Sequence, residues 1–531
     1  MTKDMTRQKT EAATRTGPSR RAVMGGMAGA GLLAASAGLI GAGRAHAETP
    51  KKGGHYRVGI HEGNTNDSLD PRTTNGVCMI QLNHTIFNFL VEIDADDSII
   101  PELAESWDAS DDATSWVFNI RKGVEFHNGK PLTAEDVVAS LKYHLKEDSQ
   151  SAAKPLLDGV TSITAETEHQ VRFDLSEGNA DLPYVLTDYH FVILPSDADG
   201  NVDISGIGTG GYVLESFEPG VRIEMSRNPN YFKEGRAHFD KVTFLVINDG
   251  NARTNALLTG EIDADSQIAA NTLKFLQRND KVLIDNVPSA GHVTIPMHTN
   301  VAPFDNVDVR LALKHAIDRD DIIDKVMGGA AVFGNDHPIG PSMPYFTAQD
   351  RNTFDPEKSR FHLKQAGMEN LSVTLATSDA TFPGAVDMAT LFQASAKKAG
   401  IDMKVDRRPA DNYWSEVWLK NPFCVAAWGA RPTPQIMFSI AYKSGAAWNE
   451  SKWENERFNS LLDSAKAELD DAKRTEMYGE MMRLCRDDGG TIVPFFLNRV
   501  QARGTNVMHS EKIGGNWQLD GARSAERWWF A

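Results

Sequence analysis

Cysteine is almost absent from this sequence, with three residues in a chain of 531. Three thiols form at most one intramolecular disulfide, and no CxxC pair is present, so a small disulfide scaffold is excluded. A bridge between Cys424 and Cys485 stays open. Because Cys485 falls in a helical pattern, a small buried hydrophobic side chain is the simpler interpretation there.

Motifs for catalysis and for metal binding are also missing. The 15 histidines include no HxH and no HxxxH pair, which argues against a metalloprotease helix or a compact zinc site. The sequence has no GxSxG elbow and no phosphate-binding GxxxxGK[ST] loop. The glycine run 206–211 lacks GxGxxG spacing and leads into a strand pattern. We therefore expect no cofactor and no metal, although dispersed carboxylates could still form an acid–base pair after folding.

Basic residues are outnumbered, with 55 Lys and Arg against 72 Asp and Glu and a net charge of −17. A polyanion such as nucleic acid would be repelled, and no basic stripe follows residue 50. The chain is 41% hydrophobic and 8% aromatic, which excludes wholesale disorder and allows a substantial core.

Outside the first 47 residues, no segment approaches 18 continuous apolar residues. Arg20 and Arg21 precede 22 uncharged residues, 22–43, and the small-x-small sequence Ala45-His46-Ala47 follows. This order predicts a twin-arginine signal cleaved near Ala47, and hence a periplasmic protein. A membrane anchor is the alternative, but seven of the 22 residues are glycine, which weakens the hydrophobic drive for insertion.

Strand-like and helix-like segments alternate through the rest of the chain. Residues 55–60 and 114–120 have strand patterns, whereas 134–145, 309–326 and 459–486 have helical ones, the last broken near 469–471. No repeat of 20 to 50 residues is visible. This mixture predicts α/β or α+β lobes rather than a helix bundle or a β-sandwich.

Two long stretches carry a family resemblance. Ile99–Trp107 and Trp116–Val138 resemble the hallmark of solute-binding protein family 5, the dipeptide-, oligopeptide-, opine- and nickel-binding proteins of ABC importers. Further similar segments follow in the family's order: Gly208–Tyr212, Arg227–Tyr231, Ala256–Asp263, Pro303–Asp305, Val309–Arg310 and Ala316–Arg319. The resemblance covers nearly the whole chain after residue 47.

The resemblance implies an α/β, two-lobed periplasmic-binding-protein clamshell, type II and similar to cluster C. Lobe I would span 48–300, with an extra subdomain at about 90–205, and lobe II would span 301–492. The tail 493–531 would return to lobe I. The strands 292–300 and 492–498 would then be the hinge crossings, with the ligand held between the lobes.

One residue departs from the pattern of the peptide-binding members. These proteins typically have an aspartate three residues after a tryptophan, and it holds the ammonium group of the peptide. This sequence keeps Trp428 and Gly429 but has Arg431 at that position. A guanidinium inverts the charge and suits carboxylate, sulfonate or phosphate oxygens. We expect Arg431 to pair with an anionic group of the ligand, its direction fixed by Pro432 and Pro434. Alternatively it points to solvent or pairs with an acidic side chain.

Other ligand contacts are expected shortly after Arg431 in the chain, at the two proposed hinge crossings, and where members of the family present ligand-facing backbone. Aromatic walls are common in small-molecule pockets, although core packing explains the aromatic candidates equally well. These further candidates are Tyr442, Trp448, His298, Asn300, Phe496, Asn498, Met79 and Gln81.

The sequence thus predicts a non-enzymatic, monomeric binding protein that delivers a small solute to an ABC permease. The solute would be peptide-like, opine-like or an amino-acid derivative. Two alternatives stay open: a module that presents its ligand to a chemoreceptor or sensor, and an exported enzyme. The sequence identifies neither the solute nor whether a metal accompanies it.

Overall fold

The computed structural model describes residues 50–531, without the side chains of 270 and 271. Glu48–Ala531 forms a compact unit. The predicted signal, residues 1–47, lies outside the described residues. Within 50–531, no helix is both long and apolar enough to cross a lipid bilayer. All three cysteines are buried and free, so Cys424 and Cys485 form no bridge.

A ten-stranded mixed sheet runs through the molecule in the order β16-β12-β18-β11-β1-β10-β9-β8, with β13 and β17 pairing to β18 and β12. β1 is parallel to β10 and β11, and the other pairs are antiparallel. The predicted opening strand is confirmed as β1. The bounds are β1 (His55–Ile60), β8 (Tyr212–Glu218), β9 (Arg222–Arg227), β10 (Lys241–Val246), β11 (Ala264–Asp265), β12 (Val282–Pro296), β13 (Ala331–Phe333), β16 (Ala426–Trp428), β17 (Thr491–Ile492) and β18 (Phe495–Gly504).

A separate antiparallel sheet forms within residues 104–175. Its order is β4-β5-β7-β6, and inward-facing Trp116, Phe118 and Ile120 alternate along β5. The helix expected at 134–145 is confirmed as α2, which begins with a capping box between Thr133 and Asp136. The elements of this region are β2 (Val91–Ile93), β3 (Ile99–Pro101), β4 (Ala104–Ala109), β5 (Ser115–Ile120), α2 (Ala134–Leu145), η2 (Lys154–Leu157), β6 (Val160–Thr167), β7 (Gln170–Leu175) and α3 (Leu182–Val185).

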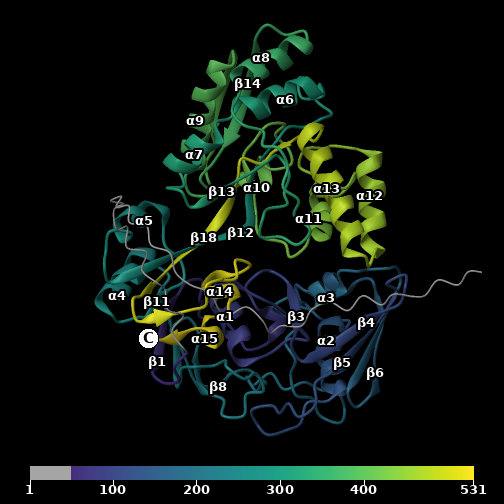
Figure 1. Cartoon of the computed structure of the whole chain (residues 1–531), viewed down its shortest axis with the longest axis vertical. Helices are drawn as coiled ribbons and strands as arrows, with labels where there is room; N and C mark the ends of the chain where they lie inside the picture. The colour runs from purple at the N-terminus through teal and green to yellow at the C-terminus, as the bar shows by residue number, and fades with distance from the viewer. Residues whose placement is uncertain (1–49) are drawn as a thin grey trace, which may run out of the picture. The chain divides into compact units, whose positions relative to one another are not determined.

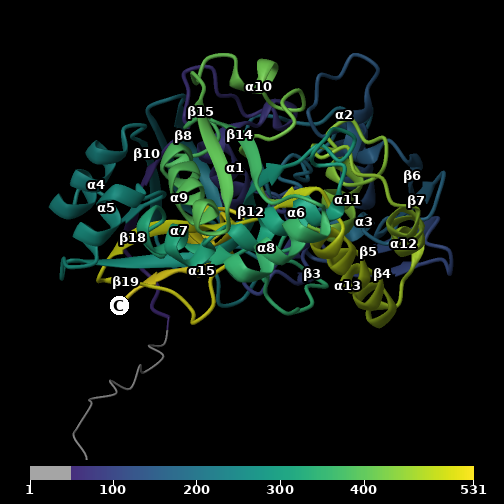
Figure 2. The same cartoon turned by 90° about the horizontal axis from the view of Figure 1, so that it is seen from above.

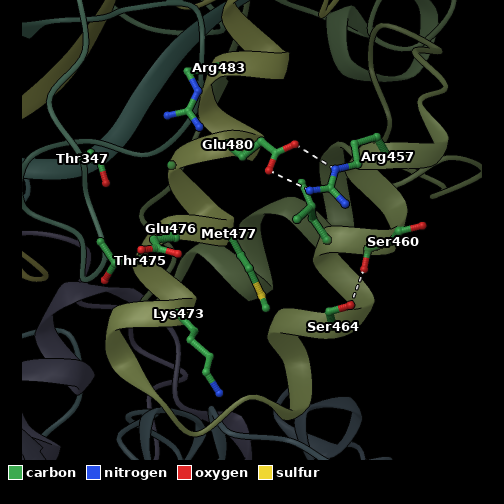
Figure 3. A pocket seen from close by; sticks show the side chains of 12 residues that line it. Thr347, Arg457, Ser460, Ser464, Lys473, Thr475, Glu476, Met477, Glu480 and Arg483 are labelled. Atoms are coloured by element: carbon green, nitrogen blue, oxygen red, sulfur yellow. Dashed lines mark hydrogen bonds and ion pairs between the residues drawn. The ribbon is translucent and has the colours of Figure 1, made fainter.

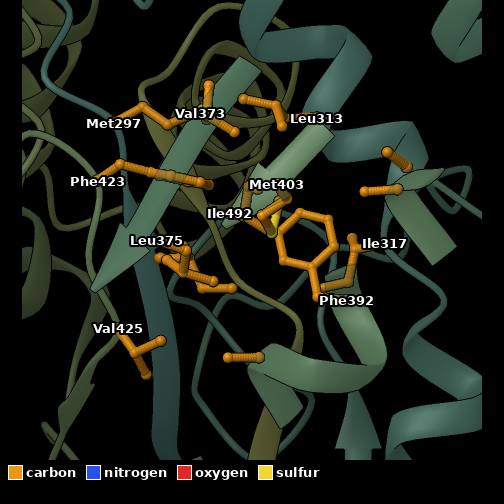
Figure 4. Packing of buried hydrophobic residues seen from close by; sticks show 14 of the residues in the cluster. Met297, Leu313, Ile317, Val373, Leu375, Phe392, Met403, Phe423, Val425 and Ile492 are labelled. Atoms are coloured by element: carbon orange, nitrogen blue, oxygen red, sulfur yellow. The ribbon is translucent and has the colours of Figure 1, made fainter. Parts of the chain in front are cut away.

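A second group of elements surrounds the parallel pair β14–β15. Helices α6, α7, α8 and α9 gather around this pair (Figures 1 and 2). Leu375 and Met403 of the two strands pack with Phe392 of α9 in the buried core (Figure 4). The bounds are α6 (Val307–Ala316), α7 (Arg319–Lys325), α8 (Pro356–Gln365), β14 (Leu371–Thr377), α9 (Ala385–Lys398), β15 (Ile401–Arg407) and α10 (Tyr413–Glu416).

Two helical predictions have different outcomes. The single helix expected at 309–326 is wrong, because Ile317 is extended and Asp318 begins a new helix by accepting a hydrogen bond from the Asp321 amide at 3.2 Å. The pair expected at 459–486 is confirmed as α12 (Glu456–Ala467) and α13 (Asp471–Asp487), which lie side by side.

The hydrophobic cores divide between two regions, here named lobe I and lobe II. Buried residues from 290 to 495 form the cores of lobe II. Lobe I contains the cores at 90–193 and around β1, and the latter also includes Val507 and Trp528 from the end of the chain. β12 and β18 pair along most of their lengths and run between the lobes (Figure 1). Within this arrangement the exact lobe boundaries stay a prediction.

The remaining elements belong to these layers or connect them. They are η1 (Pro71–Thr73), α1 (Gly76–Ile86), α4 (Gly250–Thr259), α5 (Ala270–Leu276), α11 (Pro434–Ala441), β19 (Val507–Met508), α14 (Gln518–Gly521), α15 (Ser524–Arg527) and β20 (Trp529–Phe530).

Candidate functional site

Arg431 lies in a short loop between β16 and α11. Trp428 ends β16, where it pairs with His292 of β12. The Arg431 Nη1 donates hydrogen bonds to the carbonyls of Gly429 at 3.2 Å and Ala430 at 3.1 Å. Its guanidinium carbon is 5.8 Å from the Trp428 ring centroid. These contacts fold the side chain back over its own loop and limit its direction.

The charge of Arg431 has no carboxylate partner among the residues that the structure describes. The side chain is partly buried. Burial lowers the pKa of Arg431, and the nearby Tyr189 hydroxyl opposes that shift. Tyr189 follows α3 in lobe I, so the guanidinium of lobe II lies near a group of the other lobe. A partly desolvated cation without a counterion is suited to bind an anionic group.

A cluster of tryptophans stands beside this loop. The Trp428 ring lies 5.9 Å from Trp448 and 6.2 Å from Trp418, and Trp414 lies 5.7 Å from Trp418. Trp448 is 44% exposed and Trp414 41% exposed, whereas Trp428 is buried. We name Trp414, Trp418, Trp428 and Trp448 the tryptophan cluster. Its buried member Trp428 lies next to Arg431, and its members Trp414 and Trp448 offer partly exposed aromatic faces.

A buried carboxylate supports the tryptophan cluster from within. Glu450 accepts hydrogen bonds from Trp418 Nε1 at 2.6 Å and from Thr294 Oγ1 at 2.9 Å. Burial raises the pKa of Glu450, although these donors stabilise its charged form. Sequence reasoning missed Trp414, Trp418 and Glu450. The four-residue spacing of Trp414 and Trp418 was a signal that both could share one helical face.

The candidates on the crossing strand β18 have different surroundings. Phe496 is 1% exposed, and its ring lies 5.5 Å from that of His292. Gly340 permits this packing, since a Cβ there would be 2.8 Å from the Phe496 ring. Asn498 is partly buried, and its Nδ2 donates to Asn286 Oδ1 at 2.8 Å. The crossing strands are thus joined by side chains as well as by backbone.

His298 and Asn300 follow the end of β12 in lobe II. His298 is buried, and its backbone amide donates to the Pro422 carbonyl at 2.9 Å. Asn300 lines a cavity of about 640 Å³ together with Asp305, Arg310 and Lys452. The residues that line this cavity do not include Arg431 or the tryptophan cluster.

Three candidates are buried among other protein groups. Tyr442 is 5% exposed and packs with Phe438 in a core of lobe II. Met79 is buried in the lobe I core on α1. Gln81 is 1% exposed, and its Nε2 donates to the Gln518 carbonyl at 2.7 Å. Their side chains therefore contact protein in this structure, and their role toward a ligand stays a prediction.

A larger cavity, of about 710 Å³, lies against α12 and α13 (Figure 3). Its lining includes Met477 and the ion pair of Arg457 Nε with Glu480 Oε1 at 2.8 Å. None of the sequence-predicted site residues belongs to this lining. Because Arg457 already has a counterion there, we place the candidate site at Arg431 instead. In residues 50–531 no group of three or more His, Cys, Asp or Glu is arranged to hold a metal ion.

Comparisons with known proteins identify the family. Residues 98–450 match the model for bacterial extracellular solute-binding proteins, family 5. A dipeptide-binding protein of Pseudomonas aeruginosa is 26% identical over 81% of this chain and 87% of the relative. A probable D,D-dipeptide-binding periplasmic protein of Escherichia coli is 26% identical over 75% of this chain and 79% of the relative.

Solved structures show the same fold. HbpA2 of Haemophilus parasuis has a TM-score of 0.79 at 21% identity and covers 88% of this chain and 99% of its own. AgaA of A. tumefaciens, in complex with agropinic acid, has a TM-score of 0.68 at 22% identity, with 90% and 99% covered. The predicted two-lobed α/β fold is thereby confirmed. The family consists of binding proteins, in agreement with the expected absence of enzymatic activity. The chain belongs to the bacterial extracellular solute-binding proteins, family 5.

Proposed function

We propose that this protein is the periplasmic substrate-binding protein of an ABC importer, and that it captures a small solute through an anionic group paired with Arg431. One observation carries the proposal: Arg431 is partly buried and has no carboxylate partner among the described residues. A desolvated guanidinium is unfavourable without a counterion. The solute would supply that counterion.

The position of Arg431 suits capture between two lobes. The β16–α11 loop belongs to lobe II, and Tyr189 near its guanidinium belongs to lobe I. β12 and β18, which connect the lobes, would carry the hinge motion. Closure would remove water from the ion pair and strengthen it, because the interaction of two charges increases as the local dielectric constant falls. The closed form would then dock on the membrane permease, with residues 1–47 acting as the export signal.

The charge of Arg431 narrows the solute class. Relatives are named as dipeptide-, di/tripeptide- and glutathione-binding proteins, and one structural neighbour holds agropinic acid. A guanidinium would repel the free ammonium group of an ordinary peptide bound in the usual orientation. Carboxylated opine-like compounds and other acidic amino-acid derivatives fit better. The tryptophan cluster would cover the less polar part of such a solute.

The test is titration calorimetry on purified protein without residues 1–47. The ligand panel contains free dipeptides, N-acetylated dipeptides and opines, first ranked by the rise in melting temperature. For a bound acidic compound, Arg431→Gln should weaken affinity about 10- to 100-fold, the range of a lost charge-assisted hydrogen bond. Arg407→Gln is the matched control, since Arg407 is 71% exposed. Unchanged affinity in Arg431→Gln would refute the proposal.

A further inference from the structure

A second guanidinium that has no carboxylate partner in the described part of the chain lies on β18. Arg499 is partly buried, and its Nε is fully buried without a hydrogen-bond partner among the described residues. Within residues 50–531 its side chain makes one hydrogen bond, from Nη2 to the Asn516 carbonyl at 3.5 Å, the long limit for such a contact. The guanidinium carbon is 5.9 Å from the Trp517 ring centroid. Arg499 is therefore held mainly by an aromatic face.

The electrostatic surroundings of Arg499 favour an additional anion. Burial lowers the pKa of Arg499, and Glu62 opposes this shift. Glu62 is not in salt-bridge contact, and its Oε2 accepts the Val77 amide at 3.1 Å. Other buried arginines do have carboxylate partners, as Arg503 with Asp285 at 3.1 Å shows. A buried cation that lacks such a partner is costly, so an anion from outside the chain would stabilise it.

One aromatic pair links Arg499 to Arg431. Trp517 and Tyr189 pack edge to face with their ring centroids 5.3 Å apart. Arg499 contacts Trp517 from one strand, and Tyr189 is the group that opposes the pKa shift of Arg431. Two cations without a carboxylate partner among residues 50–531 are therefore associated with this aromatic pair, Arg499 over Trp517 and Arg431 through its electrostatic interaction with Tyr189. They come from β18 and from the β16–α11 loop, and the rings come from lobe I.

We propose that Arg499 is a second anion anchor of the Arg431 site and that the solute is a dianion with two separated carboxylate groups. One carboxylate pairs with Arg431 and the other with Arg499, and the segment between them lies along Tyr189 and Trp517. Both guanidinium groups can bind a carboxylate through two parallel hydrogen bonds. This proposal rests on the proposed function, because Arg431 is the first anchor.

The test compares matched probes on matched variants. The probes are α,ω-dicarboxylates from succinate to pimelate and N-acetyl-glutamate, each paired with the monocarboxylate of the same length. At least one dianion should raise the melting temperature more than its monoanionic partner. In calorimetry, Arg499→Gln should bind that dianion about 10- to 100-fold more weakly and no better than the monoanion. Arg431→Gln should lose affinity for both, and Arg407→Gln for neither.

The outcomes separate the two proposals. If Arg499→Gln still prefers the dianion, the second anchor is wrong while the role of Arg431 stands. If Arg431→Gln binds normally, the proposed function itself fails. If no dianion binds better than its monoanion, the dianionic class is overturned. Should Arg499→Gln fail to fold, phenylglyoxal labelling of the unsubstituted chain replaces it: the dianion should protect Arg499, and equal labelling with and without the dianion contradicts the proposal.

Discussion

At the level of single residues, the candidate site depends on one change of charge. The sequence identified Arg431 because the tryptophan before it marks a position that the family resemblance assigns to a carboxylate. The structure adds that this guanidinium has no carboxylate partner among the described residues and lies near Tyr189. Sequence reasoning could not find Tyr189, Trp517 or Arg499, because their proximity depends on folding of segments far apart in the chain.

Restoring the carboxylate should reverse the ligand preference. Arg431→Asp is expected to reduce affinity for acidic compounds at least about 100-fold, since it replaces attraction by repulsion. It should also allow binding of a dipeptide with a free ammonium group. Calorimetry with one free dipeptide and its N-acetylated form would show this exchange, and an unchanged order of the two affinities would contradict it. Arg431→Gln is the neutral control. It should lower the affinity for acidic ligands without producing affinity for the free dipeptide.

An exposed tryptophan of the tryptophan cluster and a buried tryptophan outside it test whether the cluster contributes to ligand binding or to stability. Trp448 is 44% exposed and contacts Trp418 and Trp428, so Trp448→Ala should weaken ligand binding with little effect on the free energy of unfolding. Trp453 is 3% exposed and its Nε1 donates to Asp488 Oδ2 at 2.8 Å. Trp453→Ala should destabilise lobe II by about 3–5 kcal/mol. Chemical denaturation and calorimetry on both variants distinguish these roles, and a large loss of stability in Trp448→Ala would assign that residue to the core.

At the level of elements, N-terminal caps explain a helix boundary that hydrophobic periodicity alone did not predict. The apolar pattern over 309–326 is continuous enough to predict one helix, yet the chain breaks at Ile317 and Asp318. Asp318 offers the side-chain oxygen that a helix start requires, and this local hydrogen bond competes with continuation of α6. The strand β5 and the helices α2, α12 and α13 were predictable because their patterns and caps agree.

Removal of this cap should cost about 1 kcal/mol of unfolding free energy, the usual effect of losing an N-cap oxygen. Asp318→Ala is therefore expected to lower the denaturation midpoint of lobe II slightly while ligand affinity is retained. Asp324→Ala is the control, because Asp324 is an exposed residue of the same helix α7. Equal unfolding curves for Asp318→Ala and the unsubstituted protein would show that the hydrogen bond adds no stability.

At the level of the whole molecule, buried histidines link stability to pH. Five buried histidines have pKa values that burial, as the largest cause, lowers from 6.5 to about 4, or about 3 for one of them. They are His61, His84, His144, His292 and His337. Below pH 6.5 the unfolded chain binds protons that these folded side chains do not, so stability is full above that pH and falls toward pH 4.

The melting temperature should therefore fall by several degrees between pH 7 and pH 5. His144 is fully buried, with Nδ1 at 2.7 Å from Ser151 Oγ, and it lies outside the proposed site. His144→Gln should reduce the slope of melting temperature against pH. Each buried histidine accounts for a loss of unfolding free energy on the order of 1–3 kcal/mol when the pH falls to 4. Thermal unfolding at several pH values measures this, and a constant melting temperature from pH 7 to pH 5 would contradict the assignment.

A buried ion pair also joins the two lobes away from the crossing strands. Arg474 of α13 pairs with Asp181, just before α3, and donates to the Tyr345 hydroxyl at 2.7 Å. Nearby, the Ala180 amide donates to the Lys466 carbonyl at 2.8 Å. Charge pattern could not predict this pair, because 293 residues separate its members. Because the Arg474–Asp181 pair lies between the lobes, closure of the lobes depends on these two side chains as well as on the crossing strands.

Breaking this pair on one side should separate the lobes. Asp181→Asn leaves the Arg474 charge, which is 3% exposed, without its carboxylate, and breaking a buried pair in this way costs about 3–5 kcal/mol. Hydration of the freed guanidinium requires α13 to move away from α3, so the radius of gyration in solution scattering should rise and ligand affinity should fall. The double variant with Arg474→Met removes the charge as well and should recover part of both losses. Arg474→Met alone completes the comparison. If the loss of unfolding free energy in the double variant equals the sum of the losses in the two single variants, the two side chains do not interact in solution. The lobes are then held together by the backbone pairing of β12 and β18 instead.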